Sequence, residues 1–188
     1  AFVVYAGNLG NEFAMDDAYN VVQNERISDL RRLPEFFTSA WGGHAGGYAA
    51  QINTGYYRPM SELSLALDYA LYGLSPTGYH LTNNLLHVLN SVLVFVLCLQ
   101  LGLRRLPSAV AAVVFAVHPV HTEAVNLITY RTELLATWFG LLALIAYLRM
   151  HSSKTRWAAV AVLYALGLAC KETIVTLPGW ILLLELLL

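Results

Sequence analysis

Long apolar stretches separated by short polar breaks fill the second half of the chain, and this pattern predicts membrane-spanning helices. A helix needs about 20 apolar residues to cross a hydrocarbon layer roughly 30 Å thick. The predicted spans are 79–103, 107–129, 132–150, 157–170 and 173–188, preceded by residues 1–9 as the end of an earlier span. We therefore expect an all-α, polytopic transmembrane bundle that is truncated at both ends.

A polar and aromatic region, residues 10–78, is too charged to cross a membrane and is predicted to form one large external loop. Within it, 16–28 and 62–74 are predicted to be short surface helices. Apolar residues recur at helical spacing on one stripe of the second helix, while Glu62 and Asp68 point away from that stripe. We expect this helix to lie on the membrane surface.

Two further features concern the loops. Glycines cluster between residues 42 and 55, which predicts a flexible loop. The short loops at 104–106 and 149–156 hold basic residues and no carboxylate, whereas most carboxylates fall on the other side of the predicted bundle. Because basic residues favour cytoplasmic loops, these two loops are predicted to be cytoplasmic and residues 10–78 external.

The composition agrees with a membrane protein. Apolar residues make up 57% of the chain and charged residues 12%, whereas a soluble domain holds roughly 45–50% and about 25%. The net charge of −1 gives no electrostatic reason to expect a nucleic-acid partner. Cys98 and Cys170 lie in apolar runs and are predicted to be small buried hydrophobes.

Polar residues interrupt two of the predicted spans before they could cross. The stretch that starts at Pro107 meets HPVHTEAV after Val117, and the last stretch is broken by Lys171 and Glu172. Ionisable groups at membrane depth normally face a bundle interior or a wet cavity. We therefore expect a water-filled cleft that opens on the side of Asp16 and takes in His118 and Lys171.

The pair Asp16-Asp17 has two interpretations. Aspartate is a favoured N-cap, so the pair could simply start the helix that follows. Alternatively, one carboxylate is a general base and the other supports it. The position of the pair, soon after a span and at the mouth of the expected cleft, favours the functional interpretation.

The cluster His118, His121 and Glu123 resembles a set of metal ligands. Its HxxH spacing, with Pro119 between, differs from the HExxH helix, where both histidines share one face. We therefore expect no cofactor, and a divalent metal is the less favoured alternative. Hydrogen bonding to a phosphate or an acceptor peptide is preferred, with polar packing as the other alternative.

Several other side chains could bind an anion or face a polar interior. Arg58, Arg131 and Lys171-Glu172 are candidate anion binders. The alternatives are that Arg58 snorkels to the membrane interface and that Lys171 and Glu172 form a buried ion pair. His80, Asn84 and His87 form one stripe at the start of a predicted span, which must face protein or a cavity. Ordinary hydrogen bonding between helices would also explain this stripe.

Taken in order, the motifs resemble those of a known family. They are MDDAYNVVQNERI, YYRPM, SLALDYALYGLSPTGYHLTNNLLH, VVFAVHPVHTEAVNLITYRTELLA and CKETIVTLP. The series resembles the membrane half of the transmembrane-and-TPR-repeat protein O-mannosyltransferases and their bacterial relatives, which are GT-C glycosyltransferases. The resemblance covers nearly all of the 188 residues, and the TPR region of that family has no counterpart among them.

The resemblance implies transfer of a mannose-like sugar from a polyprenyl-phosphate carrier to a Ser/Thr hydroxyl of an acceptor protein. Asp16 or Asp17 would be the base, with Asp16 slightly preferred. The residues expected to bind donor phosphate or substrate are Arg58, His80, His87, His118, His121, Glu123, Arg131, Lys171 and Glu172.

The implied location is a bacterial inner membrane with a periplasmic active face, or the endoplasmic reticulum with a lumenal one. The main alternative is a non-catalytic accessory or assembly subunit of a membrane complex that keeps a GT-C-like scaffold. A transporter is less favoured because the segment shows no internal symmetry.

Overall fold

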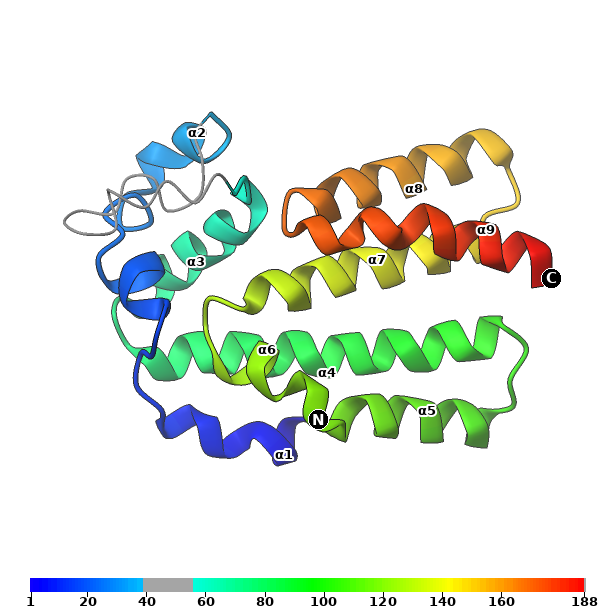
Figure 1. Ribbon diagram of the computed structural model, residues 1–188, viewed down its shortest axis with the longest axis horizontal. Coiled ribbons are helices and arrows are strands. Elements are labelled where there is room, and N and C mark those ends of the chain that lie inside the picture. The colour runs from blue at the N-terminus through cyan, green and yellow to red at the C-terminus, as the bar shows by residue number, and fades with distance from the viewer. Residues whose placement is uncertain (39–55, 188) are drawn as a thin grey trace.

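The computed structural model describes residues 1–38 and 56–187, and throughout these ranges the regular structure is helical, with no strand. The all-α prediction is therefore confirmed (Figure 1). The predicted glycine-rich loop, residues 42–55, lies outside the described residues. The longer helices are α3 (Pro59–Tyr72), α4 (Pro76–Gln100), α5 (Arg105–Val117), α7 (Arg131–Arg149), α8 (Ser153–Leu168) and α9 (Leu177–Leu187).

Short elements connect or precede these helices. They are α1 (Phe2–Tyr5), η1 (Ala6–Gly10), η2 (Ala18–Val22), η3 (Leu30–Arg32), α2 (Leu33–Phe36), η5 (Pro119–His121), α6 (Thr122–Asn126) and η6 (Glu172–Thr176).

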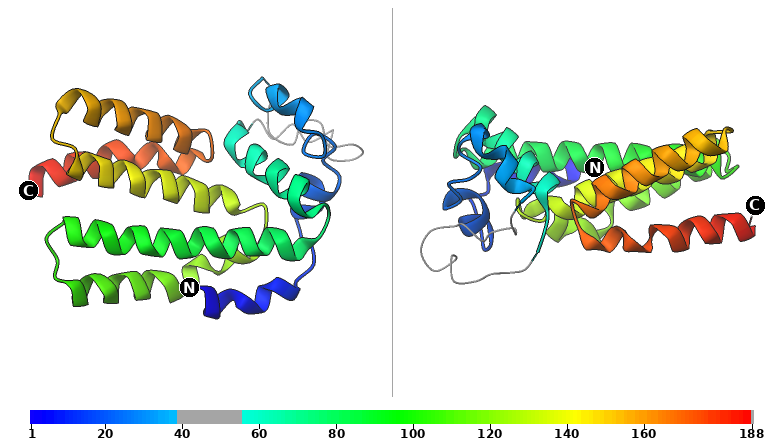
Figure 2. Two further views of the ribbon diagram at one scale, coloured as in Figure 1. Left: turned by 180° about the vertical axis from the view of Figure 1, so that it is seen from behind. Right: turned by 90° about the horizontal axis from the view of Figure 1, so that it is seen from above.

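Helix α4 is the centre of the bundle, with α5 along one side and α7 along the other (Figure 1). Helix α8 packs on the far side of α7, and α9 runs beside α7 and α8, set off from the plane of the other helices (Figures 1 and 2). Proline at the first position of α4 suits a helix start, because its missing N–H would have no partner there. Gly102, with φ of 85°, allows the tight turn from α4 into α5.

The helices bring two sets of loops to opposite ends of the bundle. The α4–α5 and α7–α8 turns, which carry the short-loop basic residues, lie at one end. The elements between η1 and α3 lie at the other end, together with the α6–α7 and α8–η6 connections (Figure 1). The arrangement has the two-sided form that the charge pattern indicates, whereas the compartment of each end stays a prediction.

By length and composition, α4 and α7 could each cross a membrane. Helix α5 and the following segment Pro119–Asn126 would make a third span if this pair, bent by 45°, is counted as one. The bend lies at His118, whose extended backbone is the conformation that a following proline favours. Among the described helices, α8 and α9 are 16 and 11 residues long, so the predicted spans at 157–170 and 173–188 stay predictions.

The predicted helix at 16–28 is wrong. Only Ala18–Val22 form a regular helical turn, of the π type, and turns follow it. Asn24 explains the break, because its side chain donates to the carbonyl of Asn20 and accepts from the backbone N–H of Arg26. These local bonds offer the backbone an alternative to a continuing helix.

The second predicted surface helix exists as α3, but its polar face differs from the expectation. Glu62 and Asp68 are 2% and 4% exposed, in ion pairs with Arg26 at 3.1 Å and Arg131 at 2.6 Å. Leu67 and Leu71 are exposed on the apolar stripe. The face of α3 that carries the carboxylates therefore packs on protein, whereas part of the apolar stripe is exposed; that this helix lies on the membrane stays a prediction.

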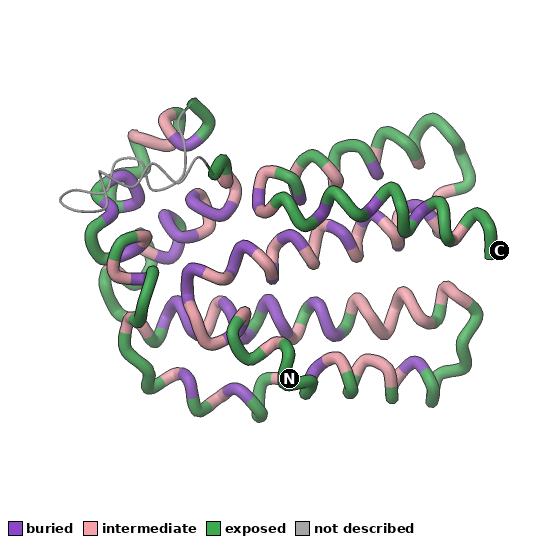
Figure 3. Tube along the Cα trace, viewed as in Figure 1, coloured by how far each residue is buried: buried purple, intermediate pink, exposed green. Residues whose placement is uncertain are grey.

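Burial is concentrated in the half of α4 nearest the loop-rich end (Figure 3). His80, Asn84 and His87 are each 1% exposed there, so the prediction that this stripe faces protein or a cavity is confirmed, and it faces protein. Asn84 exchanges two hydrogen bonds with Asn8 of η1, at 2.9 and 3.1 Å. Polar contacts, rather than apolar packing alone, thus fix the N-terminal segment against α4.

Candidate functional site

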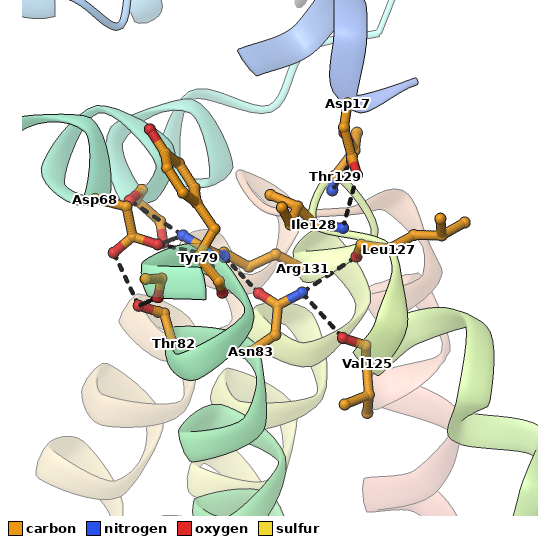
Figure 4. Close-up of polar contacts among 12 residues, drawn as sticks. Asp17, Asp68, Tyr79, Thr82, Asn83, Val125, Leu127, Ile128, Thr129 and Arg131 are labelled. Atoms are coloured by element: carbon orange, nitrogen blue, oxygen red, sulfur yellow. Dashed lines mark hydrogen bonds and ion pairs between the residues drawn. The ribbon is translucent and has the colours of Figure 1, made fainter. Parts of the chain in front are cut away.

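Asp17 is buried and bound by protein groups. Its Oδ1 accepts hydrogen bonds from the backbone N–H and the hydroxyl of Thr129, at 2.8 and 2.7 Å (Figure 4). Its Oδ2 accepts from the backbone N–H groups of Ala14 and Ile128, at 3.2 and 3.4 Å. With its side chain 1% exposed, Asp17 fixes the connection between α6 and α7 to the N-terminal loop.

Asp16 is different, because its side chain is exposed. The described residues donate no hydrogen bond to its carboxylate. Neither aspartate caps the helical turn that follows, since η2 has no side-chain cap. The N-cap interpretation of the pair is therefore wrong. The pair instead consists of one anchored carboxylate and one free carboxylate at the surface.

Tyr130 lies among several of the candidate residues, although the sequence analysis did not single it out. The negative charge of Glu123, with smaller contributions from burial, Asp16 and Glu133, raises the pKa of the Tyr130 hydroxyl. The ammonium of Lys171 lies 5.8 Å from the centre of the tyrosine ring. Tyr130 thus lies beside Lys171, and its hydroxyl is influenced by the charges of Glu123 and Asp16.

Lys171 is paired with Glu133 of α7, and Thr173 donates to the second oxygen of that carboxylate at 3.4 Å. The alternative of a buried ion pair between Lys171 and Glu172 is therefore wrong, since Lys171 pairs with Glu133 and Glu172 pairs with Arg58. The Arg58 guanidinium donates to both oxygens of Glu172, at 2.8 and 3.0 Å.

The start of α3 holds the connection between α8 and η6. The backbone N–H of Met60 donates to the carbonyl of Ala169 at 3.1 Å, and the hydroxyl of Ser61 donates to the carbonyl of Cys170 at 3.2 Å.

Burial is the largest influence on the pKa of Glu172 and raises it. The backbone bond and Arg58 outweigh burial, so the pKa of Glu172 is lowered. The two candidate cations Arg58 and Lys171 are therefore held at one turn.

Arg131 does not fit the expectation that it binds a donor phosphate. Its side chain is 1% exposed, and it donates to Asn83 at 2.7 Å, to the carbonyl of Tyr79 at 3.0 Å and to Ser64 at 3.2 Å (Figure 4). With the ion pair to Asp68, these bonds occupy its guanidinium. Arg131 joins α3, α4 and α7, and its geometry is that of a structural residue.

The histidines divide into a buried and an accessible set. His80 and His87 are buried in α4, out of reach of an external phosphate, and a nitrogen of His87 bonds the carbonyl of Ala116 at 3.0 Å. His121 is half-buried, with its ring 5.1 Å from that of His87 and 4.3 Å from that of Phe115. His118 is exposed, and its Nδ1 accepts from the backbone N–H of Val120. When the ring is neutral, the proton is then on Nε2, facing away from the backbone.

The accessible candidates thus form two groups, one at the loop-rich end of the bundle and one beside His87 near the middle of α4. One surrounds Tyr130, and the other contains His118 and His121 beside α1 and α5. Across the described part of the chain, no three His, Cys, Asp or Glu side chains are grouped so as to hold a metal ion. The arrangement offers a free carboxylate, paired cations and a tyrosine hydroxyl, which are groups suited to proton transfer and anion binding.

Comparison with known proteins found similar sequences. The chain is 34% identical over 179 residues to protein O-mannosyl-transferase Tmtc1 of Drosophila melanogaster, which covers 94% of this chain and 20% of that protein. It is 32% identical over 180 residues to human TMTC3, which covers 93% and 19%. It is 32% identical over 205 residues to human TMTC4, which covers 95% and 27%.

No family model matches the sequence, and no solved structure matches it. The chain spans about a fifth to a quarter of the length of the relatives named above. The match nevertheless extends over almost the whole of this chain, and it confirms the resemblance that the motifs indicate. The chain is therefore a homologue of one segment of the TMTC protein O-mannosyl-transferases.

Proposed function

We propose that the chain is catalytic membrane machinery of a GT-C-type glycosyltransferase. It transfers a mannose-like sugar from a polyprenyl-phosphate carrier to a Ser or Thr hydroxyl of an acceptor protein, on the external face of the membrane. The names of its relatives support a protein glycosyltransferase. We add to this the polyprenyl-phosphate donor, the external face of the membrane and the roles of the individual residues.

The observation that carries the proposal is the contrast between the two aspartates. A Ser or Thr hydroxyl is a weak nucleophile until a base accepts its proton. Asp16 is an exposed carboxylate that no described group occupies, and it is fixed in the chain next to the anchored Asp17. This free carboxylate can accept the hydroxyl proton as the acceptor oxygen attacks.

In the proposed transfer one bond forms, one bond breaks and one proton moves to Asp16. The acceptor oxygen forms a bond to the anomeric carbon of the sugar, and the bond from that carbon to the phosphate oxygen breaks. The electron pair of the broken bond leaves with the lipid phosphate, and the proton of the hydroxyl moves to Asp16. Cationic groups must stabilise the charge that develops on the phosphate.

Arg58 and Lys171 are the proposed phosphate-binding cations. Both are paired with a glutamate, Arg58 with Glu172 and Lys171 with Glu133. The side chain of Glu172 is 62% exposed, so its carboxylate can swing away and let a phosphate take its place on Arg58. In the contact with Glu172 a single nitrogen, Nη2, donates to both carboxylate oxygens, whereas Arg–phosphate bonds frequently use two parallel N–H groups.

The accessible histidines and Glu123 have proposed supporting roles. His118 can donate a hydrogen bond from Nε2 to a phosphate or to an acceptor peptide, and His121 lies beside it. Glu123 can orient the hydroxyl of Tyr130 next to Asp16. The proposed reaction uses no cofactor. If it required a divalent cation, sugar transfer would be lost when a chelator is added to the assay.

A reconstituted transfer assay tests the function itself. The full-length protein is purified and reconstituted in liposomes. A radiolabelled polyprenyl-phosphate mannose and an unmodified acceptor protein are then added. We expect label in the acceptor and, by mass spectrometry, a polyprenyl phosphate bound to the purified protein. Absence of transfer with the donor supplied would contradict the proposal and favour an accessory subunit of a membrane complex.

A further inference from the structure

The contact between Asp17 and Thr129 joins two segments that are 112 residues apart in the sequence. One segment is the N-terminal loop that presents Asp16, and the other is the connection that presents Tyr130. Thr129 gives two donors to the same carboxylate oxygen, its backbone N–H at 2.8 Å and its hydroxyl at 2.7 Å (Figure 4). Thr129 is 7% exposed, so water competes little for these bonds.

The loop that this contact holds has an unfavourable backbone conformation. Met15 has φ of 51°, in the left-handed region that residues with a side chain rarely adopt. Its side chain is 73% exposed, so packing of that side chain does not fix the conformation. Strain of this kind persists only where the surroundings hold it, and it is concentrated at functional sites.

Asp17 supplies the bonds that hold Met15 in place. The backbone N–H of Ala14 donates to Oδ2 of Asp17 at 3.2 Å, and the backbone N–H of Asp17 donates to the carbonyl of Ala14 at 3.0 Å. The turn is thus closed on both sides of Met15. Asp16 follows directly, and the direction in which its side chain leaves the chain depends on this turn.

We infer that Thr129 is a positioning residue, which acts through Asp17 to fix the loop that carries the Asp16 carboxylate against the connection that carries Tyr130. The inference rests on the proposed function, since it assigns Thr129 a role in the same transfer. Catalysis by a base depends on geometry, and a small displacement of a reacting group lowers the rate without preventing binding. Loss of the Thr129 hydroxyl should therefore lower kcat and leave the donor KM unchanged.

Thr129→Val tests this directly, because valine keeps the branched shape and the backbone N–H and removes only the hydroxyl. Thr129→Ser restores the hydroxyl and is the rescue variant. Thr132→Val is the matched control, since Thr132 is buried to a similar extent three residues later at the start of α7. The measurements are kcat and donor KM for sugar transfer, and the thermal midpoint of each purified variant in detergent.

We expect Thr129→Val to lower kcat by about tenfold at constant donor KM, which corresponds to a small displacement of the base. Thr129→Ser should recover most of the rate, and Thr132→Val should behave as the unaltered protein. A normal kcat for Thr129→Val overturns the inference. A folded Thr129→Ser protein that transfers as slowly as Thr129→Val also overturns it.

Two further comparisons keep the result decisive. If Thr129→Val does not fold, the milder Thr129→Cys, with its weaker donor, takes its place, and a kcat equal to that of Thr129→Ser overturns the inference. Asp16→Asn separates this inference from the proposed function. Near-normal transfer by Asp16→Asn overturns the assignment of Asp16 as the base, and with it this inference. Loss of transfer in Asp16→Asn with a normal Thr129→Val overturns only the role of Thr129, whereas absence of transfer by the unaltered protein overturns the proposed function itself.

Discussion

Arg58 at the start of α3 donates to both carboxylate oxygens of Glu172, at 2.8 and 3.0 Å, across 114 residues of sequence. The guanidinium also lies 4.4 Å from the centre of the Tyr56 ring. The contact ties the start of α3 to the connection that carries Lys171. In the proposed reaction, a cation held in this way is oriented before the phosphate arrives, and the exposed glutamate is the group that the phosphate displaces.

Removal of either cation should weaken use of the donor. We expect Arg58→Ala and Lys171→Ala to raise the donor KM by about tenfold each, because a charge-assisted hydrogen bond contributes roughly 1.5–3 kcal/mol. The measurement is the dependence of transfer rate on donor concentration. Arg32→Ala is the matched control, since Arg32 also pairs with a glutamate, Glu35, at the surface. Equal donor KM values for all three variants would contradict the assignment.

The two aspartates should differ in their effect on stability. Asp17→Asn keeps one acceptor oxygen but turns an amide group toward backbone donors, so it should destabilise the protein by about 1–3 kcal/mol. Asp16→Asn should leave the stability unchanged, because its carboxylate is exposed and accepts no hydrogen bond from the described residues. Thermal unfolding of the two purified variants in the same detergent checks this. Identical midpoints would mean that the bonds to Asp17 contribute little.

Arg131 should be required for folding rather than for donor binding. Arg131→Ala would leave Asp68 buried without its ion pair, and loss of one partner of a buried pair costs about 3–5 kcal/mol. We expect little folded protein in a size-exclusion profile. Arg105→Ala, at an exposed position on the other end of the bundle, is the control. A well-folded Arg131→Ala protein with a raised donor KM would return Arg131 to the phosphate-binding set.

The orientation in the membrane can be read by labelling. Ser153→Cys lies at the start of α8, next to the basic α7–α8 connection, and Ser28→Cys lies in the region predicted to be external; both positions are exposed. A membrane-impermeant maleimide applied to intact cells should distinguish the two. In microsomes, labelling before the membrane is permeabilised is compared with labelling afterwards. We expect Ser28→Cys to be labelled from the external or lumenal side and Ser153→Cys from the cytoplasmic side. The reverse pattern would invert the topology.

Helix positions were the most predictable part of the fold. The apolar runs at 79–103 and 132–150 correspond to α4 at Pro76–Gln100 and α7 at Arg131–Arg149. Local rules account for this agreement, since the length of an apolar run and a proline at a helix start act within a few residues. The region around Asn24 departs from its apparent helical pattern because a side chain there bonds to the backbone.

Long-range partners explain what the sequence could not predict in the candidate site. Arg131 and Glu62 were assigned to a phosphate site and an outward face, yet their partners Asp68 and Arg26 enclose them within the protein. Tyr130 was overlooked because a tyrosine in a short connection carries no pattern of its own. Its position seven residues after Glu123 and three before Glu133 was the one local signal. The pairing of Asp17 with Thr129 depends on the fold and has no counterpart in sequence spacing.

The most direct test of the account is the initial rate of sugar transfer by Asp16→Asn, compared with Glu12→Gln as a matched control. Both variants replace an exposed carboxylate of the same loop by its amide. Because an amide cannot accept the acceptor's proton, we expect Asp16→Asn to lower the rate by about 10²–10⁴-fold, with normal folding and membrane insertion. Glu12→Gln should transfer at the unaltered rate. Near-normal transfer by a folded Asp16→Asn protein would contradict the assignment of Asp16 as the base.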